Sequence, residues 1–339
     1  MQMSPIAPIP GGDAVESPSY NGHRTHDGYG PSGRSPWLDI DWRAHQRWVV
    51  VDGQPVNTID LGEGPPIVFV HGLSGSWPNW LEQLPVFAGG STDRGSHATS
   101  DRPAGSPIGE HRVIAMDLPG FGHSPMPRER ITISGYARLL DGLMGELGID
   151  AAAVVGNSMG GFISAELAIA FPQRVERLVL VSPAGLSTYN HRGATRALPT
   201  LQRTNRIVAA YTGWVVSKAD VVTKRPGLRN ATLGLVTRHP SRLPAALVAE
   251  QIRGAGKPGF IQALEANLNY DFRDRLPEIA CPTLIVWGAE DRVITARDAA
   301  VYAELIPGSR KVVYADTGHM AMLERPDTFN ALLRDFLEE

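Results

Sequence analysis

A Gly-x-Ser-x-Gly pattern at the end of an apolar run constrains the fold of this chain more than any other feature. It spans Gly156 to Gly160, follows alanines and valines, and precedes a helix-like run from Phe162 to Ile169. In a sharp turn between a strand and a helix, the central serine hydroxyl is exposed, and the glycines let the two elements approach closely. Ser158 is therefore the candidate nucleophile.

Composition limits the class of protein. The chain has 339 residues, a net charge of -3 and 42 % hydrophobic residues, which suits about two domains or one domain with a large insertion. This charge balance gives no sign of nucleic-acid binding, and no apolar run reaches the roughly 18 residues of a membrane span. The start of the chain lacks a signal-peptide pattern, and the single cysteine, Cys281, fits a reducing compartment. We expect a cytoplasmic protein that needs no metal or cofactor.

Apolar runs and helical patterns alternate along most of the chain. A hairpin is expected over 48–51 and 56–61, and continuous apolar runs follow, as in strands buried on both faces. Helical periodicity appears between them, for example over 133–147. This alternation predicts an α/β fold with a doubly wound, mostly parallel sheet. The buried strands are expected at 67–70, 113–116, 153–155, 177–181, 283–287 and 311–314.

Three segments depart from this alternation. Residues 1–36 are rich in Pro, Gly and Ser and predict a disordered extension. Residues 89–110 have a similar composition and are too long for an ordinary connection, so we expect a surface insertion. Residues 186–276 carry helical patterns broken by prolines and no strand pattern. They predict a helical cap, inserted into a core of residues 37–185 and 277–339 and lying over the strand ends, where ligands bind.

Two polar loops could supply partners for Ser158. A serine hydroxyl needs a base within hydrogen-bond reach and a third group that orients this base. Glu290-Asp291 follows the predicted strand 283–287, and the loop from Asp316 to His319 follows the predicted strand 311–314. Serine, acid and histidine thus occur in the chain order expected when a Gly-x-Ser-x-Gly turn carries the nucleophile.

Together these motifs resemble those of a known family. From about Trp48 to the C-terminus, the chain is similar to α/β-hydrolases that use a serine nucleophile and carry a helical cap, such as esterases and lipases. Five landmarks in the family's order are far more specific than any one of them. The landmarks are His71-Gly72, Asp117 to Ser124, Gly156 to Gly161, Gly288 to Asp291 and Gly318-His319.

The resemblance implies a role for each polar residue. Ser158 would be the nucleophile, His319 the general base and then acid, and Asp291 the group that orients the imidazole. Glu290 competes with Asp291 for the last role, and the family pattern Gly-x-x-Asp favours Asp291. Asp316 is expected to serve the turn before the last helix instead.

The resemblance also implies an oxyanion hole and a pocket. The backbone N–H groups of Leu73 and Met159 would stabilise the negative oxygen of the intermediate. His71 is expected to support its loop rather than to carry a proton, and His123-Ser124 to have a structural role. Trp80 is expected first of all to pack beneath the pocket, with substrate contact as its alternative role. The candidate substrate contacts are Gly72, Trp80, Tyr211 and Trp214.

The nucleophile limits the substrate. Similar epoxide hydrolases and haloalkane dehalogenases carry an aspartate in place of Ser158, whereas a serine indicates acyl transfer through an acyl-enzyme. A carboxylic ester, with lipids included, is the first expectation. The segment from Gly156 to Gly161 also resembles that of hydrolases that cleave carbon-carbon bonds in ring-cleavage products, although those carry a tryptophan where this chain has Met320. A non-catalytic, ligand-binding homologue is the third alternative, although all three catalytic positions are intact.

Charge is unevenly distributed over the predicted cap. Between Ser187 and Arg275 there are 14 Lys and Arg against 5 Asp and Glu, and some of them flank the apolar run from Ile207 to Val216. This excess predicts contact with an anionic lipid surface, or steering of an acyl substrate with an anionic head group. Solvated charges around helices that only close the pocket are the preferred interpretation, and lipid contact or steering is the hypothesis to be tested. The sequence leaves the oligomeric state open.

Overall fold

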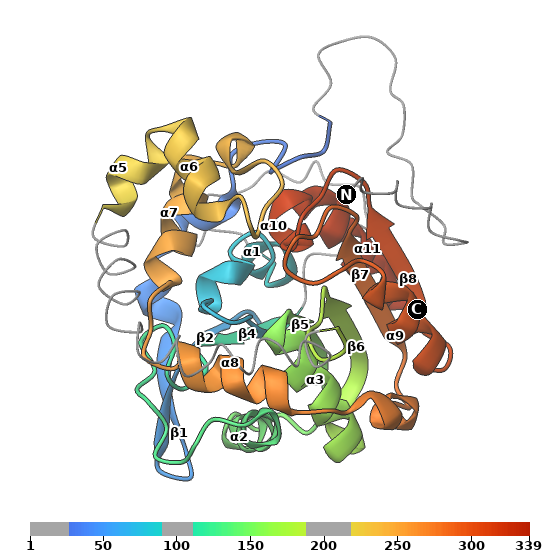
Figure 1. The fold of residues 1–339 in the computed structure, drawn as a ribbon. Helices are drawn as coiled ribbons and strands as arrows, with labels where there is room; N and C mark the ends of the chain where they lie inside the picture. The colour runs from blue at the N-terminus through green and yellow to red at the C-terminus, as the bar shows by residue number, and fades with distance from the viewer. Residues whose placement is uncertain (1–26, 90–110, 188–217) are drawn as a thin grey trace, which may run out of the picture.

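A single sheet organises the fold. The computed structural model describes residues 27–89, 111–187 and 218–339. The strands are β1 (Gln46–Val51), β2 (Gln54–Leu61), β3 (Pro66–Val70), β4 (Arg112–Met116), β5 (Ala152–Asn157), β6 (Val175–Val181), β7 (Thr283–Gly288) and β8 (Arg310–Tyr314). They form one sheet in the order β1-β2-β4-β3-β5-β6-β7-β8 (Figure 1). The pairs β1-β2 and β2-β4 are antiparallel and all other neighbours are parallel, which confirms the mostly parallel α/β sheet.

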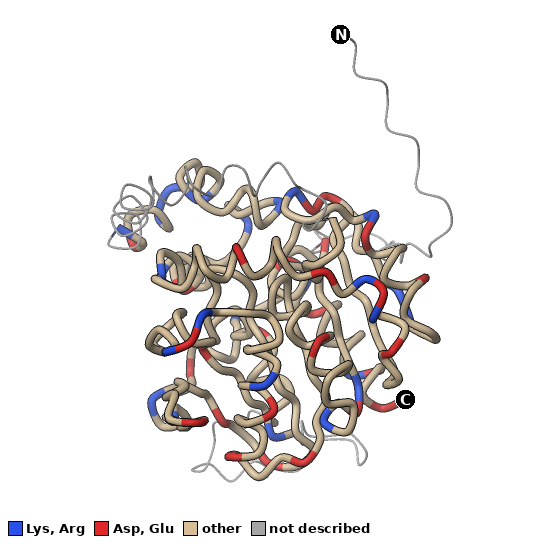
Figure 2. Tube along the Cα trace, turned by 60° about the horizontal axis from the view of Figure 1, so that its bottom comes forward, with Lys and Arg blue, Asp and Glu red and all other residues tan. Residues whose placement is uncertain are grey.

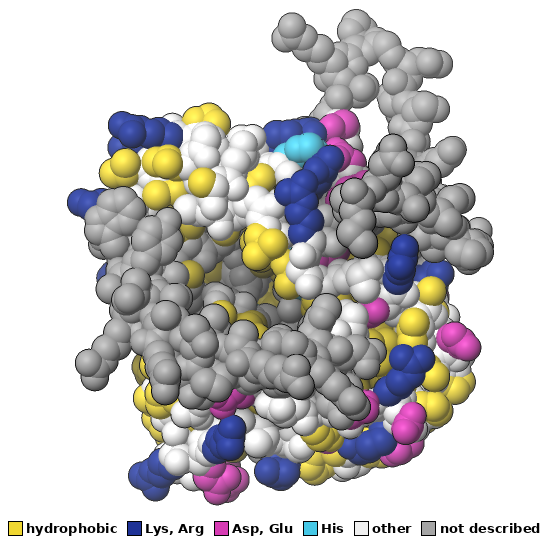
Figure 3. All heavy atoms as spheres, in the orientation of Figure 1, with side chains coloured by type: hydrophobic (Ala, Val, Ile, Leu, Met, Phe, Trp, Pro, Cys, Tyr) yellow, Lys and Arg dark blue, Asp and Glu magenta, His cyan; other side chains and the backbone are white. Residues whose placement is uncertain are grey.

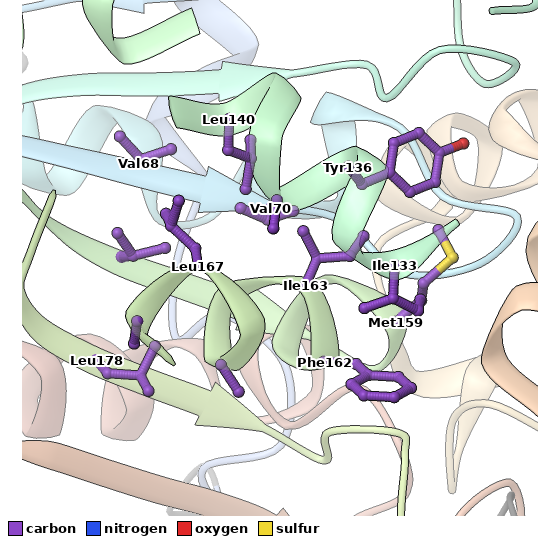
Figure 4. Close-up of a cluster of buried hydrophobic side chains, with 14 of the residues drawn as sticks. Val68, Val70, Ile133, Tyr136, Leu140, Met159, Phe162, Ile163, Leu167 and Leu178 are labelled. Atoms are coloured by element: carbon purple, nitrogen blue, oxygen red, sulfur yellow. The ribbon is translucent and has the colours of Figure 1, made fainter. Parts of the chain in front are cut away.

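Helices cover both faces of the sheet. Outside the cap they are α1 (Leu84–Phe87), α2 (Ile133–Glu146), α3 (Met159–Ala170), α9 (Asp298–Leu305), α10 (Ala321–Glu324) and α11 (Pro326–Glu338). One hydrophobic cluster lies between the sheet and α2, α3 and α9. Figure 4 shows part of it, where Val68 and Val70 of β3 face the side chains of α2 and α3. The alternate residues Ile67 and Phe69 belong to a second cluster with α1, α10 and α11, so they lie on the opposite face.

Burial explains why the central strands have continuous apolar sequences. All six residues of β5 and all six of β7 are buried. A strand with helices on both faces has no solvent-facing side, so its sequence does not alternate between polar and apolar residues. Because β3, β4, β5, β6, β7 and β8 run parallel, their carboxyl ends meet at one edge of the sheet, where their loops can form a site.

The predicted extension over residues 1–36 is wrong in its last part. Residues 1–26 lie outside the described residues, but Tyr29 is only 2 % exposed. Ser35 is buried as well, and its hydroxyl donates to the Glu82 carboxylate at 2.7 Å. These two residues stand in a sequence rich in Pro, Gly and Ser and are ordered by partners far along the chain, which composition does not reveal.

The described part of the predicted cap is helical. It contains α5 (Ala219–Thr223), α6 (Pro226–Leu233), α7 (Ala245–Gly254) and α8 (Phe260–Asn269), and residues 218–276 contain no strand. In Figure 1, α5, α6 and α7 lie together, while α8 lies beside α2. Gly259 N donates to Gly120 O at 3.0 Å, which joins the start of α8 to the core. Residues 90–110 of the predicted insertion and 188–217 of the cap lie outside the described residues.

Several arginines of the described cap form ion pairs with acidic side chains. Basic and acidic residues are interspersed along the trace in Figure 2, and the face in Figure 3 shows no single basic block. The pairs are Arg238–Asp316, Arg242–Asp27, Arg253–Asp220 and Arg275–Glu166. In the part of the chain that the structure describes, no helix combines the length and apolar character needed to cross a bilayer. Lipid contact and the cytoplasmic location stay predictions.

Candidate active site

Ser158 lies at a strained turn between β5 and α3. Its φ of 55° and ψ of -119° put a non-glycine residue in an unfavourable backbone region, at a cost of about 1–3 kcal/mol. Its N–H donates to Val181 O at 2.9 Å, and its carbonyl oxygen accepts from Phe162 N at 3.1 Å and Ala184 N at 3.0 Å. These bonds to α3 and to the end of β6 hold the turn in place despite its strain.

Glycines around Ser158 allow the close packing that this turn needs. A Cβ on Gly160 would overlap the carbonyl oxygen of Val70, and a Cβ on Gly156 would overlap the backbone of Gly160. A Cβ on Gly72 would lie 2.9 Å from the Cβ of Ser158. The structure therefore places Gly72, a predicted substrate contact, directly against the candidate nucleophile.

The N–H groups of Leu73 and Met159 lie in the two segments that meet at Ser158. Met159 is the first residue of α3, so its N–H has no acceptor within the helix. Among the described residues, neither N–H donates a hydrogen bond to another protein group. Two unpaired donors next to a nucleophile are suited to stabilise an oxygen that becomes negative during the reaction.

His319 and Asp291 form a buried pair. Nδ1 of His319 lies 2.7 Å from Oδ2 of Asp291, and the two side chains are 6 % and 0 % exposed. The other carboxylate oxygen, Oδ1, accepts from Val293 N at 2.8 Å and Ile294 N at 3.0 Å. Since three donors surround the carboxylate, its position is fixed and the imidazole is oriented by it.

The other two acidic candidates have different partners. Glu290 Oε2 accepts from Thr317 N at 2.9 Å, so this carboxylate holds the histidine loop through its backbone. Asp316 lies 2.8 Å from Nε2 of the cap residue His239. Among Glu290, Asp291 and Asp316, it is Asp291 that contacts the His319 ring, as the sequence motif predicts.

Asn157 connects the serine turn to the histidine loop. Its Nδ2 donates to Val181 O at 3.1 Å and to the carbonyl oxygen of His319 at 3.4 Å. The loop after β8 therefore reaches across β7 and β6 to the residue directly before Ser158. Ser158, Asp291 and His319, which are far apart in the sequence, come from three loops at the same edge of the sheet.

His71 supports the loop that carries Gly72. Its Nε2 accepts from Leu118 N at 3.0 Å, and its Nδ1 donates to Gly72 O at 2.7 Å. Burial lowers the pKa of His71, so the ring stays neutral with both nitrogens engaged. Ser124 also has a structural contact, because its Oγ accepts from Asn57 N at 2.9 Å.

The structure does not bring every predicted substrate contact to the site. Trp80 is fully buried, and its ring lies 5.1 Å from that of Phe69 in the second hydrophobic cluster. The structure therefore gives Trp80 the packing role, and its alternative role as a substrate contact is wrong, because the side chain lies in the core. Tyr211 and Trp214 lie outside the described residues, so their predicted role stays a prediction.

Two residues near His319 are missing from the sequence prediction. His319 N donates to Val236 O at 3.1 Å, which ties the histidine loop to the cap. Glu324 is fully buried and accepts from the N–H groups on both sides of His319. Neither lies within the motifs that pointed to Ser158, Asp291 and His319, and their contacts with the histidine loop depend on the assembled fold. Within residues 27–89, 111–187 and 218–339, no three His, Cys, Asp or Glu side chains are grouped to hold a metal ion.

The fold and the comparison with known families point to the same class of protein. Residues 65–326 match the family described as alpha/beta hydrolase fold, which is well over half of the chain. The chain belongs to this family, which confirms the resemblance of its motifs. Hydrolase is the class of enzyme that the fold and the relatives support.

Individual relatives differ in their chemistry. The chain is 31 % identical over 301 residues to the dihydrolipoyllysine-residue acetyltransferase component of the acetoin cleaving system of Cupriavidus necator, over 88 % of this chain and 70 % of that protein. It is 30 % identical over 305 residues to a 2-hydroxy-6-oxo-2,4-heptadienoate hydrolase of Pseudomonas putida, over 86 % and 95 %. Among solved structures, Est816, described as an N-acyl homoserine lactone degrading enzyme, is 28 % identical, with a TM-score of 0.64 and coverage of 86 % and 100 %.

Proposed function

We propose that the protein is a serine hydrolase in which Ser158 attacks a substrate carbonyl, His319 is the base and then the acid, and Asp291 orients the imidazole. The 2.7 Å contact between His319 Nδ1 and Asp291 Oδ2 carries this proposal. A carboxylate at Nδ1 keeps the ring proton there, so Nε2 remains free to accept the serine proton. The bond from Asn157 to the histidine loop supports the convergence of the two loops.

The proposed reaction has two halves. Ser158 Oγ bonds to the carbonyl carbon while its proton passes to His319 Nε2, and the carbonyl oxygen becomes negative near the N–H groups of Leu73 and Met159. His319 then protonates the leaving group, and the acyl group remains on Ser158 as an ester. Water, with its proton taken by His319, cleaves this ester and restores the serine.

A carboxylic ester is the first proposed substrate class. An ester supplies a trigonal carbon for the serine and a leaving alkoxide that one proton from His319 neutralises. The description of Est816 names a lactone, which is a cyclic ester. The alternative expectation of a homologue without catalysis is not favoured, because serine, histidine and acid are all present and the last two are in contact.

Hydrolysis of a carbon-carbon bond is the second proposed candidate. It is favoured by the 30 % identity with a 2-hydroxy-6-oxo-2,4-heptadienoate hydrolase over nearly the full length of both chains. The same serine mechanism applies, with a carbon leaving group in place of an alkoxide. Met320 directly after the histidine departs from the tryptophan that enzymes of this kind carry, which is the reason for ranking the ester first.

A substrate panel tests the two candidates against each other. Initial rates would be measured on p-nitrophenyl esters from acetate to palmitate and on 2-hydroxy-6-oxohepta-2,4-dienoate, with Ser158→Ala as the control. We expect a higher kcat/KM on an ester, and loss of turnover in the variant. A higher kcat/KM on the dienoate would replace the first candidate with the second. Absence of serine-dependent turnover on both substrates would contradict both.

A further inference from the structure

Glu324 is a buried carboxylate whose hydrogen bonds flank His319. It accepts from Gly318 N at 3.0 Å and from Met320 N at 3.2 Å, the residues directly before and after the histidine. The N–H of His319 itself donates to Val236 O in the cap at 3.1 Å. All three consecutive N–H groups of this segment are therefore held, and one carboxylate holds two of them.

The same carboxylate is bonded to the N-terminal segment and to the cap. Tyr29 donates its hydroxyl proton to Glu324 Oε2 at 2.7 Å, and Arg238 N donates to the same oxygen at 2.7 Å. The Tyr29 oxygen in turn accepts from His239 N at 2.8 Å. Gly30 N donates to the carbonyl oxygen of Glu324 at 2.7 Å. Three segments far apart in sequence thus meet at the residue that holds the histidine loop.

The hydrogen-bond partners of Glu324 suit an ionised carboxylate. All four groups on its carboxylate are donors, and a protonated carboxyl would need an acceptor for its own proton. Burial raises the pKa of Glu324, and the N–H groups of Arg238 and Gly318 oppose that shift. Burial also raises the pKa of Tyr29 above its ordinary value, so its hydroxyl keeps the proton that it donates.

Cationic side chains hold Tyr29 against this carboxylate. The guanidinium carbons of Arg242 and Arg325 lie 4.7 Å and 5.1 Å from the centre of the Tyr29 ring. Arg242 also pairs with Asp27, and Arg325 donates to the Asp27 carbonyl oxygen at 2.6 Å. Such cation–π and ionic contacts order the segment from Asp27 to Gly30 between the cap and the core.

We propose that Glu324 is a positioning residue for His319, and that Tyr29 completes its hydrogen bonding, so that the N-terminal segment and the cap together place the imidazole over Ser158. The inference rests on the proposed function, because it requires His319 to be the base for Ser158. Glu324 itself takes no part in the chemistry. A displacement of the imidazole by a fraction of an ångström lengthens the proton transfer from serine, which lowers kcat while leaving substrate contacts unchanged.

The isosteric variant Glu324→Gln separates this role from simple packing. If its amide oxygen takes the place of Oε2, it still accepts from Gly318 N, but the amide nitrogen in the place of Oε1 faces the N–H of Met320. If the amide is reversed, the nitrogen faces the N–H of Arg238. In both orientations, a donor meets a donor on the backbone that carries or contacts His319, although the shape of the side chain is preserved.

Tyr29→Phe has a matched control in the same protein. The change removes a hydroxyl that donates to Glu324 and accepts from His239 N. Tyr314→Phe removes a buried hydroxyl with no hydrogen-bond partner among the described residues. Glu338→Gln, at an exposed position of α11, is the control for the change at Glu324. All four variants are made in the full chain.

The test measures kcat and KM on a substrate that the wild type turns over, and the rate of fluorophosphonate labelling at Ser158, at a temperature where thermal melts show every variant folded. We expect Glu324→Gln to lose at least about tenfold in kcat and in labelling rate, with KM changed less than about threefold. Tyr29→Phe should lose about three- to tenfold in kcat and in labelling rate, and both control variants less than twofold. A double variant that combines Tyr29→Phe with Glu324→Gln should lose no more than Glu324→Gln alone, because both changes act on the same hydrogen bonds.

The outcomes separate this inference from the proposed function. A wild type that is neither active nor labelled at Ser158 overturns the proposed function. An active, labelled wild type with less than a tenfold loss in Glu324→Gln overturns only the positioning role. If Glu324→Gln does not fold, the other pair decides, and equal kcat values for Tyr29→Phe and Tyr314→Phe overturn the inference.

Discussion

Replacing Asp291 with asparagine should move the ring proton of His319 to the wrong nitrogen. One carboxylate oxygen accepts from Val293 N and Ile294 N, and the other from His319 Nδ1. The single oxygen of an asparagine stays with the two backbone donors, so its amide nitrogen donates to Nδ1. The neutral imidazole then carries its proton on Nε2 and cannot accept one from Ser158.

The size of the effect follows from the two backbone bonds. Turning the amide to restore the correct tautomer would leave the N–H groups of Val293 and Ile294 without an acceptor, at about 1–3 kcal/mol each. The inactive arrangement is therefore favoured by about 2–6 kcal/mol, which corresponds to a loss of roughly 30-fold to 3 × 10⁴-fold in kcat. KM should change little, because the aspartate does not touch the substrate.

The assay compares kcat and KM of Asp291→Asn, Glu290→Gln and Asp335→Asn on the best substrate of the wild type. Glu290 accepts from Thr317 N, and its amide variant keeps an oxygen for that bond, so we expect a loss below about threefold. Asp335 is exposed on α11 and serves as the matched control. The reasoning is refuted if Asp291→Asn keeps more than a tenth of the wild-type kcat, or if Glu290→Gln loses as much.

Three further predictions concern stability, packing and lipid contact. Because burial lowers the pKa of His71, the unfolded chain binds a proton there below about pH 6.5 and the folded chain does not. The free energy of unfolding, measured with denaturant, should therefore fall from pH 6.5 to 5 more steeply than in His71→Gln; equal slopes would contradict this. Trp80→Phe should lower the free energy of unfolding by about 1–3 kcal/mol and leave KM within twofold, since the indole packs on Phe69 and its N–H has no partner among the described residues; a raised KM would restore it as a substrate contact. The chain should sediment with anionic vesicles more than with neutral ones, and less at high salt; equal or absent binding would remove the lipid hypothesis.

The architecture was predictable because the central strands of the sheet are buried on both faces. β5 and β7 appear in the sequence as continuous apolar runs, since every one of their residues is buried. The turn at Ser158 was predictable for a similar reason, because close contact between Gly160 and the backbone of β3 admits no side chain. Both signals are local and depend on steric requirements that few residue types satisfy.

The choice between neighbouring acids depends on geometry. Glu290 and Asp291 are adjacent, and spacing alone leaves both as candidates. In the structure, the Glu290 carboxylate accepts from the Thr317 backbone, whereas the Asp291 carboxylate contacts the His319 ring. A motif could rank these residues, but only the path of the loop decides which one reaches the imidazole.

The N-terminal contacts could not be predicted from the sequence. The bond from Tyr29 to Glu324 joins residues 295 positions apart in the sequence. The segment has the composition of a disordered extension, and its order comes from individual tertiary partners. Such contacts follow from the assembled fold and leave no trace in local pattern.

Covalent labelling tests the central claim, that Ser158 is the nucleophile, most directly. The full chain would be treated with a fluorophosphonate, and the adduct located by intact mass and peptide mapping, with Ser158→Ala as the control. We predict one adduct, on Ser158, which is absent from the variant and forms more slowly in His319→Ala. An adduct on another residue, or an active wild type that takes no label, would contradict the account.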